Sequence, residues 1–223
     1  MTTIWSQSIL LLTESVKGWT MNQRFLVLEE EKRKAVINSG FRNFALFGYR
    51  KASMRDIAED AGVSKALLFH YFDTKKEFYL FLWSFVKEET AKSLKAKGAT
   101  GDKDYFSSME KGLKAKMELS RSWPWMALFA AKAYYEEDEE VVKELSVTID
   151  PFLKMDGETI RRLYPETHFR KDIDLTLMFR DMYYMSEGYL WHWCQKDEFD
   201  VDRMEKDYLA FISQWKRIYR EQQ

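Results

Sequence analysis

The amino-acid sequence predicts an all-α protein, and three features of its 223 residues support this class. Apolar residues recur at helical spacing along most of the chain and seldom alternate as strands would require. Only 3 residues are proline and 16% are aromatic, which favours a helical core rich in aromatic rings. A chain of this length can bury a substantial core in one large or two small domains.

Residues 1–20 precede the first sustained helical pattern, and we expect them to form a flexible N-terminal extension or an over-long start. The apolar patch from Ile9 to Leu12 has no Lys or Arg before it and no clear small-residue cleavage pattern after it, which disfavours a secretory signal. No apolar run approaches the roughly 20 residues that span a bilayer. We therefore expect a cytoplasmic protein with no membrane partner.

Residues 21–75 are predicted to form an N-terminal helical domain, which we call the reading head. Its first helix is expected from near Leu28 to Phe47 and should pack across two shorter helices. The apolar positions on one side of this helix are Val36, Ile37, Gly40, Phe41, Phe44 and Phe47.

A helix-turn-helix pattern follows within the reading head. Ser53 can cap a short helix, Gly62 supplies the conformational freedom that a corner needs, and Ser64 opens a second helix. The apolar positions of the first of these helices are Met54, Ile57, Ala58 and Ala61. Val63, Leu68 and Phe72 are expected to face inward, which leaves a polar and aromatic face of the second helix for the major groove of DNA.

The residues on that outward face have chemistry suited to DNA. Lys65 can reach a base edge or a phosphate, whereas Lys75 should reach a phosphate together with the amides of the following helix and contribute little to the core. The hydroxyl of Tyr71 can meet a phosphate, and the rings of Phe69 or His70 can touch bases. The complete candidate set is Ser53, Ser64, Lys65, Leu67, Phe69, His70, Tyr71 and Lys75.

The motif G-V-S-K-A-x-L-F-x-Y-F-x-T-K, from Gly62 to Lys75, resembles the signature of the TetR-type (TetR/AcrR) transcriptional repressors. The resemblance extends upstream and covers about the first third of a typical family member. Two departures, Leu67 and Phe69, mean that no base preference can be taken from a relative. The upstream residues that share it are Ile37, Gly40, Phe41, Phe44, Phe47, Gly48 and Tyr49.

The formal net charge is −1, so the whole molecule is not a basic coat for nucleic acid. The distribution of charge is more informative, because cations gather in the reading head while an acidic run, Glu136 to Glu140, lies further on. A modestly positive reading head on an acidic body suits a protein that meets DNA through one surface. Many of these charges could equally belong to ordinary solvated faces.

Residues 76–223 are predicted to form a helical body for ligand binding and dimerisation. Asp73 or Thr74 can cap its first helix, whose apolar stripe is Phe78, Phe81, Leu82 and Phe85. A loop is expected at residues 97–102. Further helices are expected at residues 105–120, 125–135, 150–163, 173–194 and 201–220.

The last two predicted helices are long and antiparallel, so a two-fold pairing would give a four-helix bundle. In the resembled family this arrangement is the usual dimer interface. The same helices could instead pack only on their own core. The candidate interface residues are Phe179, Trp193, Tyr208, Phe211 and Trp215.

The body is rich in aromatic and methionine side chains, which can hold an apolar or cationic effector through ring faces. The alternative is that a helical core of this size simply needs large side chains. The candidate ligand residues are Trp125, Phe129, Tyr183 and Tyr184, and no cofactor is expected.

Enzyme signatures are missing from the sequence. His70, His168 and His192 lie far apart and Cys194 is the only cysteine, which gives a metal site or a disulfide little basis. The sequence also has no phosphate-binding glycine loop and no nucleophile elbow.

The resemblance to TetR-type repressors implies a homodimeric repressor that binds a palindromic double-stranded DNA operator under the control of a small molecule. The alternatives are a helical assembly protein or a small-molecule binding protein, each without DNA-binding activity.

Overall fold

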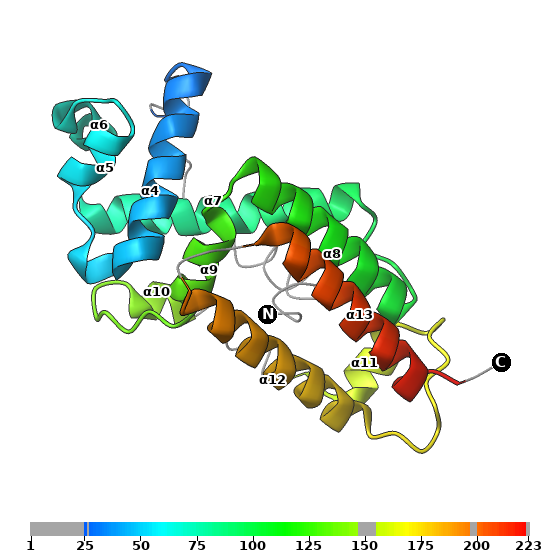
Figure 1. The fold of residues 1–223 in the computed structure, drawn as a ribbon. Helices are drawn as coiled ribbons and strands as arrows, with labels where there is room; N and C mark the ends of the chain where they lie inside the picture. The colour runs from blue at the N-terminus through cyan, green and yellow to red at the C-terminus, as the bar shows by residue number, and fades with distance from the viewer. Residues whose placement is uncertain (1–24, 26, 147–154, 197–199, 222–223) are drawn as a thin grey trace.

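A computed structural model describes residues 25, 27–146, 155–196 and 200–221. Within these residues the chain forms ten helices, α4 to α13, and no strand beyond an isolated bridge between Phe169 and Arg220. The all-α prediction is confirmed. The reading head lies at one end of an elongated helical body, and α7 runs from one to the other (Figure 1). The prediction for residues 1–20 falls outside the described residues.

The reading head contains α4 (Glu30–Lys51), α5 (Met54–Asp60) and α6 (Lys65–Tyr71). The predicted capping residues start the two short helices: Ser53 Oγ accepts from the amide of Arg55, and Ser64 Oγ accepts from that of Leu67. Gly62 lies between these helices with φ 65°, a left-handed conformation that suits glycine. The local sequence signals therefore placed both helices of the motif correctly.

The inward prediction for Phe47 is wrong. Its side chain is 52% exposed, whereas Val36, Ile37, Phe41 and Phe44 are buried as expected. The helical geometry breaks one residue later, where Gly48 has φ 70° and ψ 172°. The apolar side of α4 therefore passes from Phe44 to Tyr49 and leaves Phe47 facing solvent.

Helix α7 (Lys75–Ala96) begins at Thr74, whose side chain accepts from the amide of Glu77. Its buried stripe includes Phe78, Phe81 and Leu82, and it crosses α4 at Gly40. A Cβ atom at Gly40 would lie 2.6 Å from Cζ of Phe78, so glycine is required for this close crossing.

The rest of the body consists of α8 (Tyr105–Ser122), α9 (Met126–Tyr134), α10 (Val142–Ser146), α11 (Gly157–Leu163), α12 (Leu175–Cys194) and α13 (Val201–Tyr219). Helix α8 packs between α7 and α13, and α9 packs on α4, α7 and α12. The helix predicted at residues 150–163 has its described part at α11, capped by Asp156. One apolar core extends without a break from the reading head to α13, across the domain boundary predicted after residue 75.

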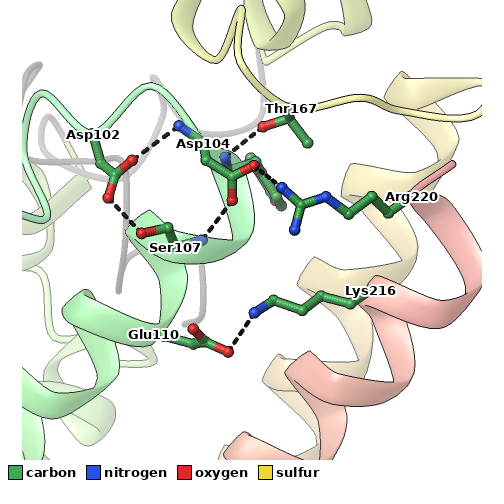
Figure 2. A network of polar contacts seen from close by, with 8 residues as sticks. Asp102, Asp104, Ser107, Glu110, Thr167, Lys216 and Arg220 are labelled. Atoms are coloured by element: carbon green, nitrogen blue, oxygen red, sulfur yellow. Dashed lines mark hydrogen bonds and ion pairs between the residues drawn. The ribbon is translucent and has the colours of Figure 1, made fainter. Parts of the chain in front are cut away.

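Polar contacts fix the C-terminal end of α13 against the start of α8 (Figure 2). Asp104 caps α8 through the amide of Ser107 and pairs with Arg220, while Lys216 Nζ lies 2.6 Å from the Glu110 carboxylate. The amide of Tyr105 donates to Thr167 Oγ1 at 2.6 Å. These contacts hold both ends of α13 in the same bundle as α8, since Arg121 near the end of α8 pairs with α13 at its start.

Candidate DNA-binding surface

Helix α6 is held on the reading head by one side and exposes the other. Leu68 is 1% exposed and packs inward, and Phe72, just after the helix, is fully buried. Lys65 and His70 are exposed, and Leu67 is partly exposed. These three side chains form the part of the candidate set that a DNA groove can meet directly.

Phe69 and Tyr71 are half-buried and pack against the apolar core. The Tyr71 ring centroid lies 5.5 Å from that of Phe25, and the Lys65 ammonium lies 5.4 Å from the centre of the Phe69 ring. Phe69 therefore supports Lys65 by a cation–π contact.

The two capping serines keep the ability to donate to a phosphate. Each side-chain oxygen accepts from a backbone amide, 3.2 Å from Arg55 N for Ser53 and 3.1 Å from Leu67 N for Ser64. An accepting hydroxyl retains its own hydrogen. Both hydroxyls mark helix N-termini, where amides and the helix dipole favour an anion.

Lys75 is more deeply engaged than the sequence predicts. Its Nζ donates to the carbonyl oxygens of Arg50 at 3.2 Å and Ala52 at 3.4 Å, and it lies 4.6 Å from the centre of the Tyr49 ring. Carbonyls at a helix C-terminus lack helical partners, so a cation there is stabilising. Lys75, which was expected to contribute little to the core, therefore joins the start of α7 to the end of α4 through its ammonium.

A buried polar network that the sequence analysis missed holds α4 against α5. Ser39 Oγ donates to the carbonyl of Ile57 at 2.7 Å, and Asn43 Nδ2 donates to the Ser39 carbonyl at 3.0 Å. Arg42 and Asn43 both contact the Asp60 carboxylate. The spacing of Ser39 and Asn43, four residues apart within an apolar stripe, was the available signal.

The four candidate ligand residues do not share one environment. Phe129 is 1% exposed and packs among the rings of Phe41, Phe44 and Tyr79. Tyr183 is buried and its hydroxyl meets that of Tyr134. Trp125 is half-buried. Tyr184, by contrast, is 65% exposed, although its ring centroid lies 5.4 Å from that of Tyr183.

The candidate dimer residues lie mostly in the core of one chain. Phe179, Trp193, Tyr208 and Trp215 are all less than 9% exposed within one chain, because they form the seam between α12, α13 and the rest of the body. Phe211 is half-buried and packs on the same core. Of these five side chains, Phe211 is the one that stays partly exposed within one chain.

A different face of α12 presents apolar side chains to solvent. Leu177, Tyr184 and Trp191 are exposed by 57%, 65% and 49%, and their spacing of seven residues places them on one side of the helix. On α13, Leu209 and Ile218 are also exposed. The three exposed side chains of α12 lie on a different side of that helix from the candidate residues Phe179 and Trp193.

Within the described residues no helix is long and apolar enough to cross a membrane, and no group of three or more His, Cys, Asp or Glu side chains could hold a metal ion. Cys194 is buried, and burial raises the pKa of its thiol to about 11. The thiol is therefore in its unreactive, protonated form at neutral pH.

Comparison with known proteins supports the class of DNA-binding regulators that the helix-turn-helix indicates. The family described as "Bacterial regulatory proteins, tetR family" matches residues 36–80, which contain the helix-turn-helix. The HTH-type transcriptional regulator RutR of Escherichia coli K12 is 30% identical over 93 residues, covering 42% of this chain and 43% of RutR. The chain thus matches less than half the length of that curated relative.

Two solved structures share the fold over most of their length. A TetR family transcriptional regulator from Chloroflexus aurantiacus has a TM-score of 0.65 at 19% identity, covering 90% of this chain and 98% of that one. The regulator FadR of Bacillus subtilis, solved with stearoyl-CoA, has a TM-score of 0.57 at 14% identity, covering 80% and 96%.

These comparisons confirm the resemblance that the sequence indicated: residues 36–80 match the tetR family, and the chain shares the fold of solved TetR family regulators. All the proteins named here are described as transcriptional regulators.

Proposed function

We propose that this chain is a cytoplasmic DNA-binding transcriptional regulator, acting as a repressor, that inserts α6 into the major groove. The observation that carries the proposal is the reading head itself: a capped α5, a glycine turn and a capped α6 with one exposed side. This is the geometry in which a recognition helix enters the groove while its partner helix crosses the backbone.

The contacts sort by the chemistry of the exposed groups. Lys65 supplies charge at the start of α6, and Ser53 and Ser64 supply hydroxyls at helix N-termini for phosphate oxygens. His70 and Leu67, on the exposed side of α6, are suited to base edges and thymine methyl groups. Lys75 acts indirectly, because its ammonium holds the end of α4 in place.

The regulator is proposed to work as a homodimer on a palindromic operator. The exposed side chains of Leu177, Tyr184 and Trp191 support a two-fold contact along α12. Two reading heads related by such an axis would meet half-sites about one helical turn apart, on the order of 34–36 Å, or further for a longer operator.

Its effector is proposed to be a small apolar molecule, with a cationic one as the alternative. The aromatic and methionine content of the body supports an apolar site, and the B. subtilis FadR structure, which shares the fold, contains stearoyl-CoA. Whichever molecule binds must favour one arrangement of the reading heads over another, since equal affinity for both would shift nothing. Melting curves with fatty acyl-CoA esters and with cationic dyes would separate the two classes.

Selection from a pool of random duplexes tests the main proposal. The purified chain should enrich a palindrome, and Lys65→Ala should weaken binding to it and reduce the salt slope by about one. Lys114→Ala is the matched control, because this lysine is exposed on α8 in the body. Enrichment of no sequence, or equal binding by both variants, would contradict the proposal.

A further inference from the structure

The acidic run at residues 136–140, which the sequence gives no role beyond surface charge, contacts the reading head. It lies between α9 and α10, beside the end of α4 (Figure 1). Glu136 Oε2 accepts from the backbone amide of Tyr49 at 3.1 Å, and Glu140 Oε2 accepts from the Tyr49 hydroxyl at 2.5 Å. Two carboxylates therefore hold one buried tyrosine by its backbone and by the tip of its side chain.

Tyr49 is suited to this role because of its place in α4. The left-handed Gly48 interrupts the helix just before it, and the Tyr49 amide is directed to Glu136. Its ring is 2% exposed, packs on Phe44 and Tyr79, and carries the Lys75 ammonium on its face. Burial, followed by the Glu140 contact, raises the pKa of the Tyr49 phenol, so the hydroxyl remains a donor.

The loop is ordered by its own hydrogen bonds. Glu136 Oε1 accepts from the amides of Glu137 and Asp138, and Asp138 Oδ1 accepts from the amide of Glu140. The two oxygens of Glu136 thus join the loop to the reading head. Glu136 is half-buried, whereas Glu137, Glu139 and Glu140 are exposed. Glu140 differs from Glu137 and Glu139 by its hydrogen bond from Tyr49.

The residues just before the loop contact α12, which carries the exposed apolar face. Tyr135 donates to Glu187 at 2.7 Å, and its ring centroid lies 5.0 Å from that of Trp191. The hydroxyls of Tyr134 and Tyr183 also meet. Consecutive residues of one short segment therefore hold the end of α4 on one side and α12 on the other.

We propose that Glu136 and Glu140 are positioning residues, forming a clasp on Tyr49 that sets the orientation of the reading head relative to α12. Lys76, which pairs with Glu144 at 2.7 Å, adds a contact from the start of α7 to α10. For a dimer joined through α12, the clasp would fix the separation of the two α6 helices. That consequence rests on the proposed DNA-binding function, whereas the orientation itself does not.

A measurement without DNA tests the clasp directly. Spin labels at Arg55 and Lys206, exposed positions on α5 and α13, report the distance between reading head and body. The Glu136→Ala/Glu140→Ala variant should show a broader distance distribution than the parent chain. The control variant Glu137→Ala/Glu139→Ala removes the same charge from the same loop and should keep the narrow distribution. An equally narrow distribution in the clasp variant would overturn the proposal.

Tyr49→Phe provides a second variant in case the double substitution disturbs folding. It removes only the hydroxyl bonded to Glu140 and keeps the ring, so the distribution should broaden to a smaller extent. Combining it with Glu140→Ala should add nothing further, because both changes remove the same bond. Additive broadening would contradict the assignment of that bond.

Operator binding gives the functional readout. Duplexes whose half-sites are moved by one base pair should bind more weakly than the selected operator, and the clasp variant should lose about tenfold of this discrimination, a typical coupling between sites. Undiminished discrimination in a folded clasp variant would overturn the role in spacing. Failure of the parent chain to bind any duplex would refute the proposed function instead, while the label distances would still decide the clasp.

Discussion

Replacing Gly40 by alanine should destabilise the protein although alanine is the better helix former. An ideal Cβ at this position would lie 2.6 Å from Cζ of Phe78 and 2.8 Å from Cδ1 of Leu82, distances that real Cβ atoms essentially never show. The crossing of α4 and α7 would therefore have to open, or the ring of Phe78 would have to move.

The change in the free energy of unfolding is the difference between two opposing effects of Gly40→Ala. Alanine in place of glycine stabilises a helix interior by about 1 kcal/mol. Overpacking a well-filled core costs about 1–3 kcal/mol, and this site belongs at the upper end because Phe78 and Leu82 are both fully buried. Phe78 also has ring neighbours at Phe44 and Phe72, with centroids 6.1 and 4.7 Å away, that restrict its movement. We expect a net loss of about 2 kcal/mol in the free energy of unfolding.

Urea denaturation followed by tryptophan fluorescence measures this difference, and the melting temperature should fall by about 4–8 °C. The same substitution in a Phe78→Leu background is the control, because the smaller side chain leaves room for the new methyl group. There Gly40→Ala should cost less than it does alone. A Gly40→Ala protein as stable as the parent, or an equal cost in both backgrounds, would refute the close-packing argument.

Three further outcomes are expected. Lys75→Ala should lower the free energy of unfolding by about 1–2 kcal/mol, since it removes charged hydrogen bonds to the Arg50 and Ala52 carbonyls. Replacing the exposed Lys65 by alanine should change the free energy of unfolding by less than about 0.5 kcal/mol, and equal melting temperatures of the two variants would contradict this difference. Tyr184→Asp should give monomers in sedimentation experiments without loss of helix content, because the side chain is 65% exposed in one chain, and a persistent dimer would remove the proposed face. Burial raises the pKa of Asp102, but hydrogen bonds from Lys111, Ser107 and the Asp104 amide outweigh burial and hold this pKa below the usual 3.8, so the stabilisation is present above about pH 4 and lost as pH falls through the lowered pKa. The loss in free energy of unfolding caused by Asp102→Asn at pH 7 should therefore shrink towards pH 2 in denaturation experiments. An equal loss at both pH values would show that the Asp102 charge is not its cause.

The extent of prediction from the sequence differs between the reading head and the body. In the reading head, Ser53, Ser64 and Thr74 cap the helices as predicted, since a capping side chain bonds to an amide only two or three residues away. Phe47 was predicted to face the core because helical periodicity was assumed to continue to the end of the helix, whereas the backbone leaves helical geometry at Gly48. Position on α6 predicted which residues of the candidate DNA-binding set are exposed, but it did not predict that the rings of Phe69 and Tyr71 are partly buried in the core.

In the body, the sequence predicted helices but not their orientation. Tyr183 and Tyr184 are adjacent and chemically identical, yet one is buried and the other is largely exposed. Helix α12 is apolar on several sides, so its periodicity does not show which side meets the core and which side a second chain. The candidate ligand and dimer residues were therefore chosen without knowledge of which side of each helix is buried, and the structure places most of them in the core of one chain.

The sequence by itself determined what depends on neighbours along the chain: an all-α fold, the helix-turn-helix, its capping residues and its TetR-type motif. Only the tertiary structure decided what depends on contacts between distant segments. It brought Glu136 and Glu140 to Tyr49, which lies 87 and 91 positions away from them in sequence. It also brought Lys75 to the carbonyls at the end of α4. The local sequence around a carboxylate in an acidic run is the same whether the carboxylate contacts water or a buried tyrosine. Its partner depends instead on the packing of α9 on α4.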